Sequence, residues 1–558
     1  IVADPVADVE NLKVIPHPKI PLPKDIYRAA GHDRLNSKGI NVHDIHELEE
    51  LKAAMEKAMQ QEWRAQPVIG GKLLNGETKP SLDPTDNRRV AGLVVEADGE
   101  MIRQAIDIAC KAQPAWDETP AAERAACLRR AADLYEEHTA EFMALCTREA
   151  GKSIADGIAE VREAVDFLRY YALRCEADFG KPMPLPGPTG EKNQLSLHGK
   201  GVFICISPWN FPLAIFTGQV AAALGAGNAV LAKPADQVSL IGALAVRLMH
   251  EAGVPGDVLH FVPARGSVMG KFGITDERVA GVCFTGSTTT GKVINRTLAE
   301  RDGIIPTLIA ETGGQNAMLV DSSALPEQVV MDVIQSAFHS AGQRCSALRV
   351  LYLQEEIADR VIDVLAGYMK TMKVGDPGLL ETDVGPVIDK AARDSLEAHA
   401  QEMIKKYKLV GRCEVPKEFA EHGTFVSPTA VEIPSLDVVE EENFGPILHI
   451  VRYRAKDLDR VIDEINRTGF GLTLGVHSRI DSEADYIARR IKVGNAYINR
   501  NMVGAVVGVQ PFGGQGLSGT GPKAGGPHYM LRFATERTLT INTAAVGGNA
   551  SLLSLRAE

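Results

Sequence analysis

Apolar and polar residues recur at helical spacing through the first third of the chain. Between residues 42 and 65 an apolar stripe runs among charged residues, which predicts an amphipathic helix. The same spacing predicts three further helices, at about residues 98–114, 120–149 and 154–178. The residues of the first stripe are Ile45, Leu48, Leu51, Met55 and Met59.

After Gly201 the pattern changes to short apolar runs that alternate with helical stretches. Such alternation predicts a parallel sheet with helices on both faces, and ligands bind such sheets at the carboxyl ends of the strands. A second αβ region is expected after Thr312, with a helix at residues 325–339 and a strand at 348–353. The predicted strands of the first region are residues 202–207, 229–233, 258–262 and 279–284.

Other segments depart from this pattern. Residues 1–42 are rich in proline and lack periodicity, which predicts an extended connector. Asn75-Gly76 predicts a hairpin turn, and residues 181–199 combine a proline-rich loop with a strand. The uncharged run 211–231 contains polar residues and is bounded by prolines, so it predicts a buried helix and a buried strand rather than a membrane span.

The composition is that of a soluble globular protein with more than one domain. The 558 residues exceed one ordinary core, and 45% hydrophobic and 24% charged residues are typical of a folded chain. A net charge of -12 argues against nucleic acid or an anionic membrane as the main partner.

The eight cysteines are scattered, without a CxxC pair or a Cys/His cluster. This spacing indicates neither a zinc site nor a disulfide framework, so we expect no metal, and a cytoplasmic location fits best. The chain begins at Ile1 without the features of a signal peptide, and we interpret it as an excised piece of a longer chain.

One thiol and one carboxylate lie on glycine-containing turns. Cys345 follows Gly342, which lets the backbone approach closely, and Arg344 beside it favours the thiolate. Glu311 precedes a glycine pair at the end of an apolar run, where a carboxylate could activate water. Taken singly, each residue has a plainer interpretation, since a lone Cys is usually a small buried hydrophobe and a lone Glu a solvated charge.

Together the two motifs resemble the signature pair of the aldehyde dehydrogenase superfamily. Glu311 stands in ETGGQNAM, and Cys345 stands 34 positions later in GQRCSA. The resemblance extends from about Pro67 to Thr540. It implies that Cys345 attacks an aldehyde and that Glu311 activates the water that hydrolyses the thioester.

The resemblance also implies the α/β aldehyde dehydrogenase fold. Its parts are a Rossmann-like NAD-binding domain, an α/β catalytic domain and a β oligomerisation arm. The corresponding residues are 1–65 for a connector and helix, 66–180 and 200–311 for the NAD-binding domain, 312–515 for the catalytic domain, and 181–199 with 530–550 for the arm and C-terminal tail.

Polar residues at the predicted strand ends are candidates for cofactor and oxyanion binding. Asn210 lies in PWNFP, which by composition is a packed turn, but the resemblance makes it a donor to the oxyanion together with the Cys345 N–H. Asp236, after Lys233, would repel a 2′-phosphate, which favours NAD over NADP. The implied cofactor-binding residues are Ile206, Ser207, Pro208, Trp209, Lys233, Asp236, Gly266, Phe284, Thr285, Gly286, Ser287, Glu442 and Phe444.

A glycine-rich segment near residues 494–514 offers backbone N–H groups suited to a carboxylate, although an exposed loop is the plainer alternative. The segment resembles the aldehyde anchor of glutamate semialdehyde dehydrogenases. The resemblance implies that Ser346, Gly504 and Ala505 hold the substrate α-carboxylate. The other implied substrate-binding residues are Phe211 and Phe512 beside the aliphatic part, Arg344, and Glu163 facing the amine.

Both ends of the chain resemble the bifunctional proline utilization A family, at residues 22–39 and 542–550. This resemblance implies NAD-dependent oxidation of L-glutamate γ-semialdehyde to L-glutamate, a flavin-dependent proline dehydrogenase module in the same polypeptide, and a homo-oligomer, expected to be a dimer. Three alternatives stay open: oxidation of another aldehyde, acyl transfer to coenzyme A, and a scaffold that has lost catalysis. Glu311 disfavours acyl transfer, and its presence with Cys345, Asn210 and Lys233 argues against a scaffold.

Overall fold

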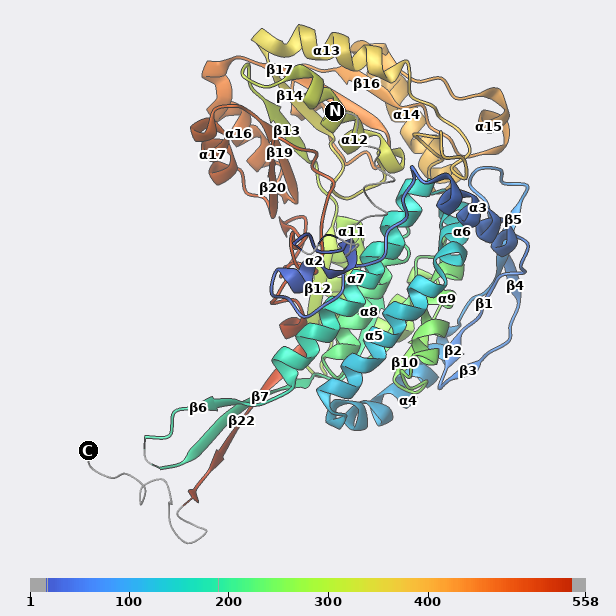
Figure 1. Ribbon diagram of the computed structural model, residues 1–558, viewed down its shortest axis with the longest axis vertical. Helices are drawn as coiled ribbons and strands as arrows, with labels where there is room; N and C mark the ends of the chain where they lie inside the picture. Colours follow the sequence, from blue (N-terminus) through green and yellow to red (C-terminus); the bar gives the residue numbers. More distant parts are fainter. Residues whose placement is uncertain (1–16, 18, 189, 544–558) are drawn as a thin grey trace.

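Two seven-stranded sheets organise the computed structural model, which describes residues 17, 19–188 and 190–543 (Figure 1). In the first sheet the strand order is β12-β11-β8-β9-β10-β2-β3, with parallel pairing from β12 to β10, as the sequence predicts. Its strands are β12 (Thr307–Thr312), β11 (Val279–Gly286), β8 (Val202–Ile206), β9 (Ala229–Lys233), β10 (Leu259–Phe261), β2 (Val68–Ile69) and β3 (Lys72–Leu73).

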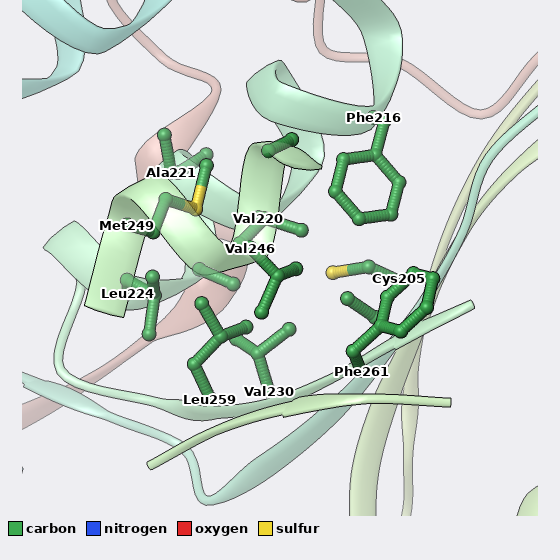
Figure 2. Close-up of a cluster of buried hydrophobic side chains, with 14 of the residues drawn as sticks. Cys205, Phe216, Val220, Ala221, Leu224, Val230, Val246, Met249, Leu259 and Phe261 are labelled. Carbon is green, nitrogen blue, oxygen red and sulfur yellow. The ribbon is translucent and has the colours of Figure 1, made fainter. Parts of the chain in front are cut away.

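The strands of this sheet are apolar because helices cover both faces. Helices α8 (Ala214–Gly225) and α9 (Ser239–Glu251) lie against β8, β9 and β10 on one face, where Phe216, Val230 and Leu259 are fully buried (Figure 2). Helix α4 (Gly99–Glu118) contacts the same three strands on the other face. The uncharged run 211–231 is therefore a buried helix and strand, as predicted.

The helices before the sheet agree with the sequence pattern except at one break. They are α4 (Gly99–Glu118), α5 (Ala121–Glu137), α6 (Thr139–Ala150) and α7 (Ile154–Phe179). The prediction of one helix over residues 120–149 is wrong, because His138 leaves helical geometry at φ -101° and ψ 23°. The Thr139 hydroxyl donates to the Glu136 carbonyl at 2.8 Å, a local bond that competes with a continuous helix.

The first hairpin lies five residues earlier than the sequence suggests. β2 pairs with β3 across Gly70 and Gly71, whose φ values of +58° and +73° suit a two-residue hairpin turn. Asn75-Gly76 instead precedes β4 (Thr78–Leu82), which pairs with β5 (Val90–Val95), and β5 also pairs with β1 (Arg64–Ala65). The adjacent pair of left-handed glycines determines the turn.

The connector is not extended throughout. It contains η1 (Pro23–Asp25) and α2 (Ile26–Ala29) before the predicted amphipathic helix, α3 (Ile45–Met59). An arm of three antiparallel strands, β6 (Met183–Leu185), β7 (Lys192–Gly199) and β22 (Ala534–Ile541), projects from the body (Figure 1). Residues 1–16 and 18 of the connector, 189 of the arm and 544–550 of the expected tail lie outside the described residues.

The second sheet has the order β15-β16-β17-β14-β13-β19-β20. All its neighbouring strands are parallel except β15 and β16. Its strands are β15 (Lys408–Arg412), β16 (Thr429–Glu432), β17 (Ile447–Tyr453), β14 (Val350–Gln354), β13 (Ala317–Val320), β19 (Thr473–His477) and β20 (Asn495–Ile498). The accompanying helices are α12 (Pro326–Ala337), α13 (Glu355–Met369), α14 (Lys390–Lys406), α15 (Lys417–His422), α16 (Leu458–Arg467) and α17 (Asp481–Arg490).

Candidate active site

The carboxyl ends of four parallel strands bring the predicted residues to one edge of the first sheet. Ile206 at the end of β8 pairs with Lys233 of β9 on one side and with Phe284 of β11 on the other. Thr285 then pairs with Glu311 of β12. Residues far apart in sequence therefore form one continuous edge.

A cavity of about 980 Å³ opens at this edge. All thirteen predicted cofactor residues line it, together with Asn210 and Cys345. Gly266 and Gly270 also line it, and a methyl group added at either would meet nothing within 4 Å, so backbone is exposed to the cavity there. The volume and the strand-end position suit a dinucleotide.

Three features of the cavity wall are suited to the parts of a dinucleotide. The buried Lys233 ammonium donates at 2.8 Å to Oδ1 of Asp236, whose carboxylate is half-exposed at the cavity. Ser287 is the N-cap of α11 (Thr288–Ala299) and accepts the Thr290 N–H, and the start of such a helix is suited to binding an anion. At the other end, Phe444 packs edge-on against Trp209 with ring centroids 5.5 Å apart.

Cys345 follows a backbone segment held in an unusual conformation. Ser340, Ala341 and Gly342 all have left-handed φ values, of 54°, 51° and 64°. A methyl group at Gly342 would lie 2.2 Å from the Gly445 carbonyl oxygen, which confirms that close backbone approach requires glycine here. Strain of this kind persists only where surrounding contacts hold the segment.

Asn316 holds the residues that follow this segment. Its Nδ2 donates to the carbonyl oxygens of Cys345 at 2.6 Å and Ala347 at 2.9 Å. Its Oδ1 accepts the Thr473 N–H at 3.2 Å. The nucleophile loop is thus tied to the starts of β13 and β19.

The Cys345 thiol is partly exposed, yet its surroundings disfavour the thiolate. Burial of the sulfur, with the charges of Glu442 and Glu311, raises the pKa of Cys345 to about 12. The Ser346 N–H and the Arg349 guanidinium act in the opposite direction. The thiol is therefore protonated at neutral pH, and a base must remove its proton.

The expectation that Arg344 favours the thiolate is wrong. Its Nη2 lies 2.7 Å from Asp156 Oδ1 on α7, and its Nε donates to Ser340 Oγ at 2.9 Å. Arg349 is the cation that acts on Cys345, and it lies 3.5 Å from Glu442 and donates to the Gly342 carbonyl at 2.7 Å. A buried carboxylate on α7 draws the neighbouring arginine away from the thiol.

Glu311 has one oxygen engaged and one without a partner among the described residues. Its Oε2 accepts the Gly514 N–H at 3.0 Å, while Oε1 is buried without a hydrogen bond. Burial raises the pKa of Glu311 to about 8, against the Gly514 N–H and the Lys523 cation. Such a carboxylate is a stronger base than an ordinary one and accepts protons near neutral pH.

Asn210 and Phe211 border the nucleophile loop. Asn210 Nδ2 donates to the Gln343 carbonyl at 3.0 Å, which uses one of its two N–H groups and leaves the other. Two cations lie near the ring of Phe211, with Lys152 Nζ 4.8 Å and Arg344 Cζ 6.0 Å from its centroid. Glu163 lies on the adjacent α7, and burial raises its pKa to about 8.

The anchor segment reaches the same region through Tyr497. The Tyr497 hydroxyl donates to the Gly504 carbonyl at 2.8 Å, and burial, with a smaller contribution from the Cys345 charge, raises the pKa of Tyr497 to about 12. Within the described residues, the N–H groups of Gly504 and Ala505 have no acceptor. Phe512 pairs with Ala524 at the far end of the segment.

Residues 74–539 match the model of the aldehyde dehydrogenase family. The chain belongs to the aldehyde dehydrogenase family. Members are typically NAD(P)-dependent. The chain is 49% identical to the bifunctional protein PutA of Klebsiella aerogenes over 96% of its own length and 41% of that protein's. The chain thus spans about two fifths of the length of these curated relatives.

Shorter relatives align over nearly their full length. The 1-pyrroline-5-carboxylate dehydrogenase of a Geobacillus species is 35% identical, over 85% of this chain and 92% of that one. Among solved structures, a bifunctional proline utilization A protein has a TM-score of 0.86 at 49% identity, covering 95% of this chain and 50% of that one. A Thermus thermophilus 1-pyrroline-5-carboxylate dehydrogenase variant has a TM-score of 0.86 at 30% identity, covering 91% and 99%.

Several residues of this aldehyde dehydrogenase site were not identified from the sequence. Asn316 could have been noticed, since it belongs to the ETGGQN motif. No local signal marks the others, because their contacts are tertiary; these are Arg349, Asp156, Lys152 and Tyr497.

In the described part of the chain no helix is long and apolar enough to cross a membrane, and no group of three His, Cys, Asp or Glu residues could hold a metal ion.

Proposed function

We propose that this chain catalyses the NAD-dependent oxidation of L-glutamate γ-semialdehyde to L-glutamate. The observation that carries the proposal is the cavity that joins thirteen cofactor-type residues to Cys345 and Asn210. The free N–H groups of Gly504 and Ala505 support a carboxylate-bearing aldehyde. The relatives named 1-pyrroline-5-carboxylate dehydrogenase support the same substrate, because this imine hydrolyses to the semialdehyde.

Cys345 is the proposed nucleophile. Cys345 lines the open cavity, so its thiol proton passes to solvent water, the sulfur forms a bond to the aldehyde carbon, and the carbonyl oxygen becomes an oxyanion. The free N–H of Asn210 and the Cys345 N–H are the proposed donors to that oxygen. The chemistry that NAD supplies when bound is acceptance of the hydride from the same carbon, which leaves a thioester on Cys345.

Glu311 is the proposed base for hydrolysis of the thioester. Its partnerless Oε1 takes a proton from water, the hydroxide adds to the thioester carbon, and the carbon–sulfur bond breaks to release the carboxylate. The pKa of about 8 suits this proton transfer. The loop around Gly513 leaves the carboxylate little room, since a methyl group at Gly513 would lie 2.7 Å from Oε1.

The residues around the cavity have proposed binding roles. Lys233 and Asp236 would hold the adenine ribose, the start of α11 the diphosphate, and Glu442 with Phe444 the nicotinamide ribose and ring. The carboxylate of Asp236 supports NAD over NADP. For the substrate, Ser346, Gly504 and Ala505 would hold the α-carboxylate.

Phe211 and Phe512 would flank the aliphatic part of the substrate. Glu163 would face the amine from α7. Arg344, which lies near Phe211 and is paired with Asp156, would form part of the substrate-binding wall. These three groups of contacts explain how one site could select an amino-acid aldehyde.

Two further proposals concern partners. The 49% identity to PutA proteins supports a flavin-dependent proline dehydrogenase module in the same polypeptide. The projecting arm, with exposed Met183, Leu539 and Ile541, supports a homo-oligomer, expected to be a dimer.

Unpaired cysteines at all eight positions, each within the described residues, support a reducing cytoplasm.

The proposal is tested by NADH formation and NAD binding in Cys345→Ala. Wild type should convert glutamate semialdehyde to glutamate with one NADH formed for each. Cys345→Ala should form none and still bind NAD, because the thiol is not a cofactor ligand. Residual turnover at the wild-type rate would refute the proposed mechanism.

A further inference from the structure

The N-terminal segment docks on α7 through one buried arginine. The Arg34 side chain is 3% exposed, and its Nη1 lies 3.2 Å from Asp166 Oδ1. The Ser37 N–H and hydroxyl donate to the same carboxylate, at 3.1 and 2.9 Å. Because both charges are buried, paired and hydrogen-bonded, the guanidinium has one well-defined position.

The same guanidinium also holds a segment 473 residues later in the chain. Its Nη2 donates to the Val507 carbonyl at 2.6 Å. The guanidinium carbon lies 3.6 Å from the Tyr27 ring centroid, so an aromatic face covers it. Arg34 is planar and forked, and its two arms therefore fix α7 and the segment around Val507 relative to each other.

That segment carries the two amides proposed to hold the substrate carboxylate. Tyr497 fixes its beginning through the Gly504 carbonyl, and Arg34 fixes its end through Val507. Gly508 follows with a φ of +77°, and a methyl group there would lie 2.9 Å from the Tyr170 ring on α7. Gly504 is itself the first attachment point and Ala505 lies between it and Val507, and the N–H groups of both residues have no acceptor among the described residues.

We infer that Arg34 is a positioning residue for substrate specificity, which sets the Gly504 and Ala505 amides at the distance that a carboxylate-bearing aldehyde requires. The inference rests on the proposed function. Asp166 neutralises the Arg34 charge, so Arg34 acts by geometry and not by attracting the anionic substrate. The N-terminal segment thereby takes part in substrate selection, although it lies outside the part of the chain that matches the family model.

The test compares glutamate semialdehyde with pentanal, which lacks the carboxylate and the amine. Arg34→Met removes both donors at similar length. We expect KM for glutamate semialdehyde to rise by about ten- to hundredfold, because displacements on the order of 1 Å cost that much. The kcat/KM for pentanal should stay within about twofold of wild type, since pentanal does not use the amides.

Arg169→Met is the matched control. Arg169 is a buried arginine of α7 that binds the N-terminal segment through the Asn36 carbonyl at 3.0 Å, and its other hydrogen bonds go to Asp133 and Glu136 and not to the anchor segment. This variant should keep the wild-type ratio of kcat/KM for glutamate semialdehyde to kcat/KM for pentanal. An equal loss of preference in Arg169→Met would overturn the inference, because docking of the N-terminal segment alone would then explain the effect.

A folded Arg34→Met enzyme with the wild-type ratio would also overturn the inference. If this variant does not fold, Arg34→Lys keeps a cation opposite Asp166 but loses the second arm, and it should still raise KM for glutamate semialdehyde alone. An unchanged ratio in Arg34→Lys would then be the contrary result. Failure of the proposed function is seen separately, as a wild-type enzyme that does not prefer glutamate semialdehyde.

Discussion

Replacement of Glu311 by Gln should separate the two halves of the reaction. The amide has nearly the shape of the carboxylate, and its oxygen can still accept the Gly514 N–H that now contacts Oε2 at 3.0 Å. The amide nitrogen would occupy the place of Oε1, which has no partner among the described residues. Gln cannot take a proton from water, so thioester hydrolysis loses its base.

The size of the effect follows from the role of a positioned base. General base catalysis contributes about 10²–10⁴-fold, so hydrolysis should slow by that factor. An unpaired buried N–H costs about 1–3 kcal/mol, but the variant also removes a buried ionisable group. The free energy of global unfolding should therefore change little, whereas the rate of thioester hydrolysis should fall strongly.

The assay is rapid mixing of enzyme, NAD and glutamate semialdehyde while NADH is monitored. Glu311→Gln should give a burst about equal to the enzyme concentration and then a slow steady state, provided Cys345 still acquires the acyl group. Glu418→Gln, which changes an exposed carboxylate on α15, should behave as wild type. A normal steady-state rate in Glu311→Gln would refute the assignment of Glu311 as the base.

Four further outcomes are expected. In wild type, kcat should rise with pH through about 8 and then level off, because only the ionised form of Glu311 accepts a proton, and Glu311→Gln should lack this rise. Ser346→Ala should lower kcat/KM for glutamate semialdehyde by about one to two decades and hardly affect pentanal, since it removes one donor to a charged group. Gly342→Ala should lose at least about 1–2 kcal/mol of stability in urea denaturation, from its left-handed φ of 64° alone, with more from the close approach to Gly445. Asp236→Ala should raise the kcat/KM with NADP relative to NAD by about tenfold, because a carboxylate beside the 2′-phosphate is removed.

The sequence predicts the architecture where local pattern and tertiary environment agree. Short apolar runs after Gly201 are the buried parallel strands, because helices cover both faces of that sheet. Cys345 and Glu311 stand in motifs long enough to resemble a known family. Gly342 is needed for the reason the sequence suggests, since a side chain there would meet Gly445.

Prediction from the sequence fails where the direction of a side chain, or the choice between two similar motifs, depends on tertiary contacts. Arg344 is adjacent to Cys345 in sequence, but adjacency does not determine where a long side chain points, and Asp156 on α7 binds it. Both Asn75-Gly76 and the earlier glycine pair suit a turn, and only the pairing of β2 with β3 selects between them. Arg34 reaches Val507 across most of the chain, which no local pattern can indicate.

On this account glutamate semialdehyde is oxidised while its aldehyde carbon is bonded to Cys345, and the oxidation leaves an acyl group on that sulfur. The most direct test is the mass of tryptic peptides from Glu311→Gln quenched in acid during the burst. The peptide containing Cys345 should carry the added mass of a glutamyl thioester, in an amount equal to the NADH formed, and Cys345→Ala/Glu311→Gln should carry none. NADH formation without this adduct, or an adduct on another residue, would contradict the account.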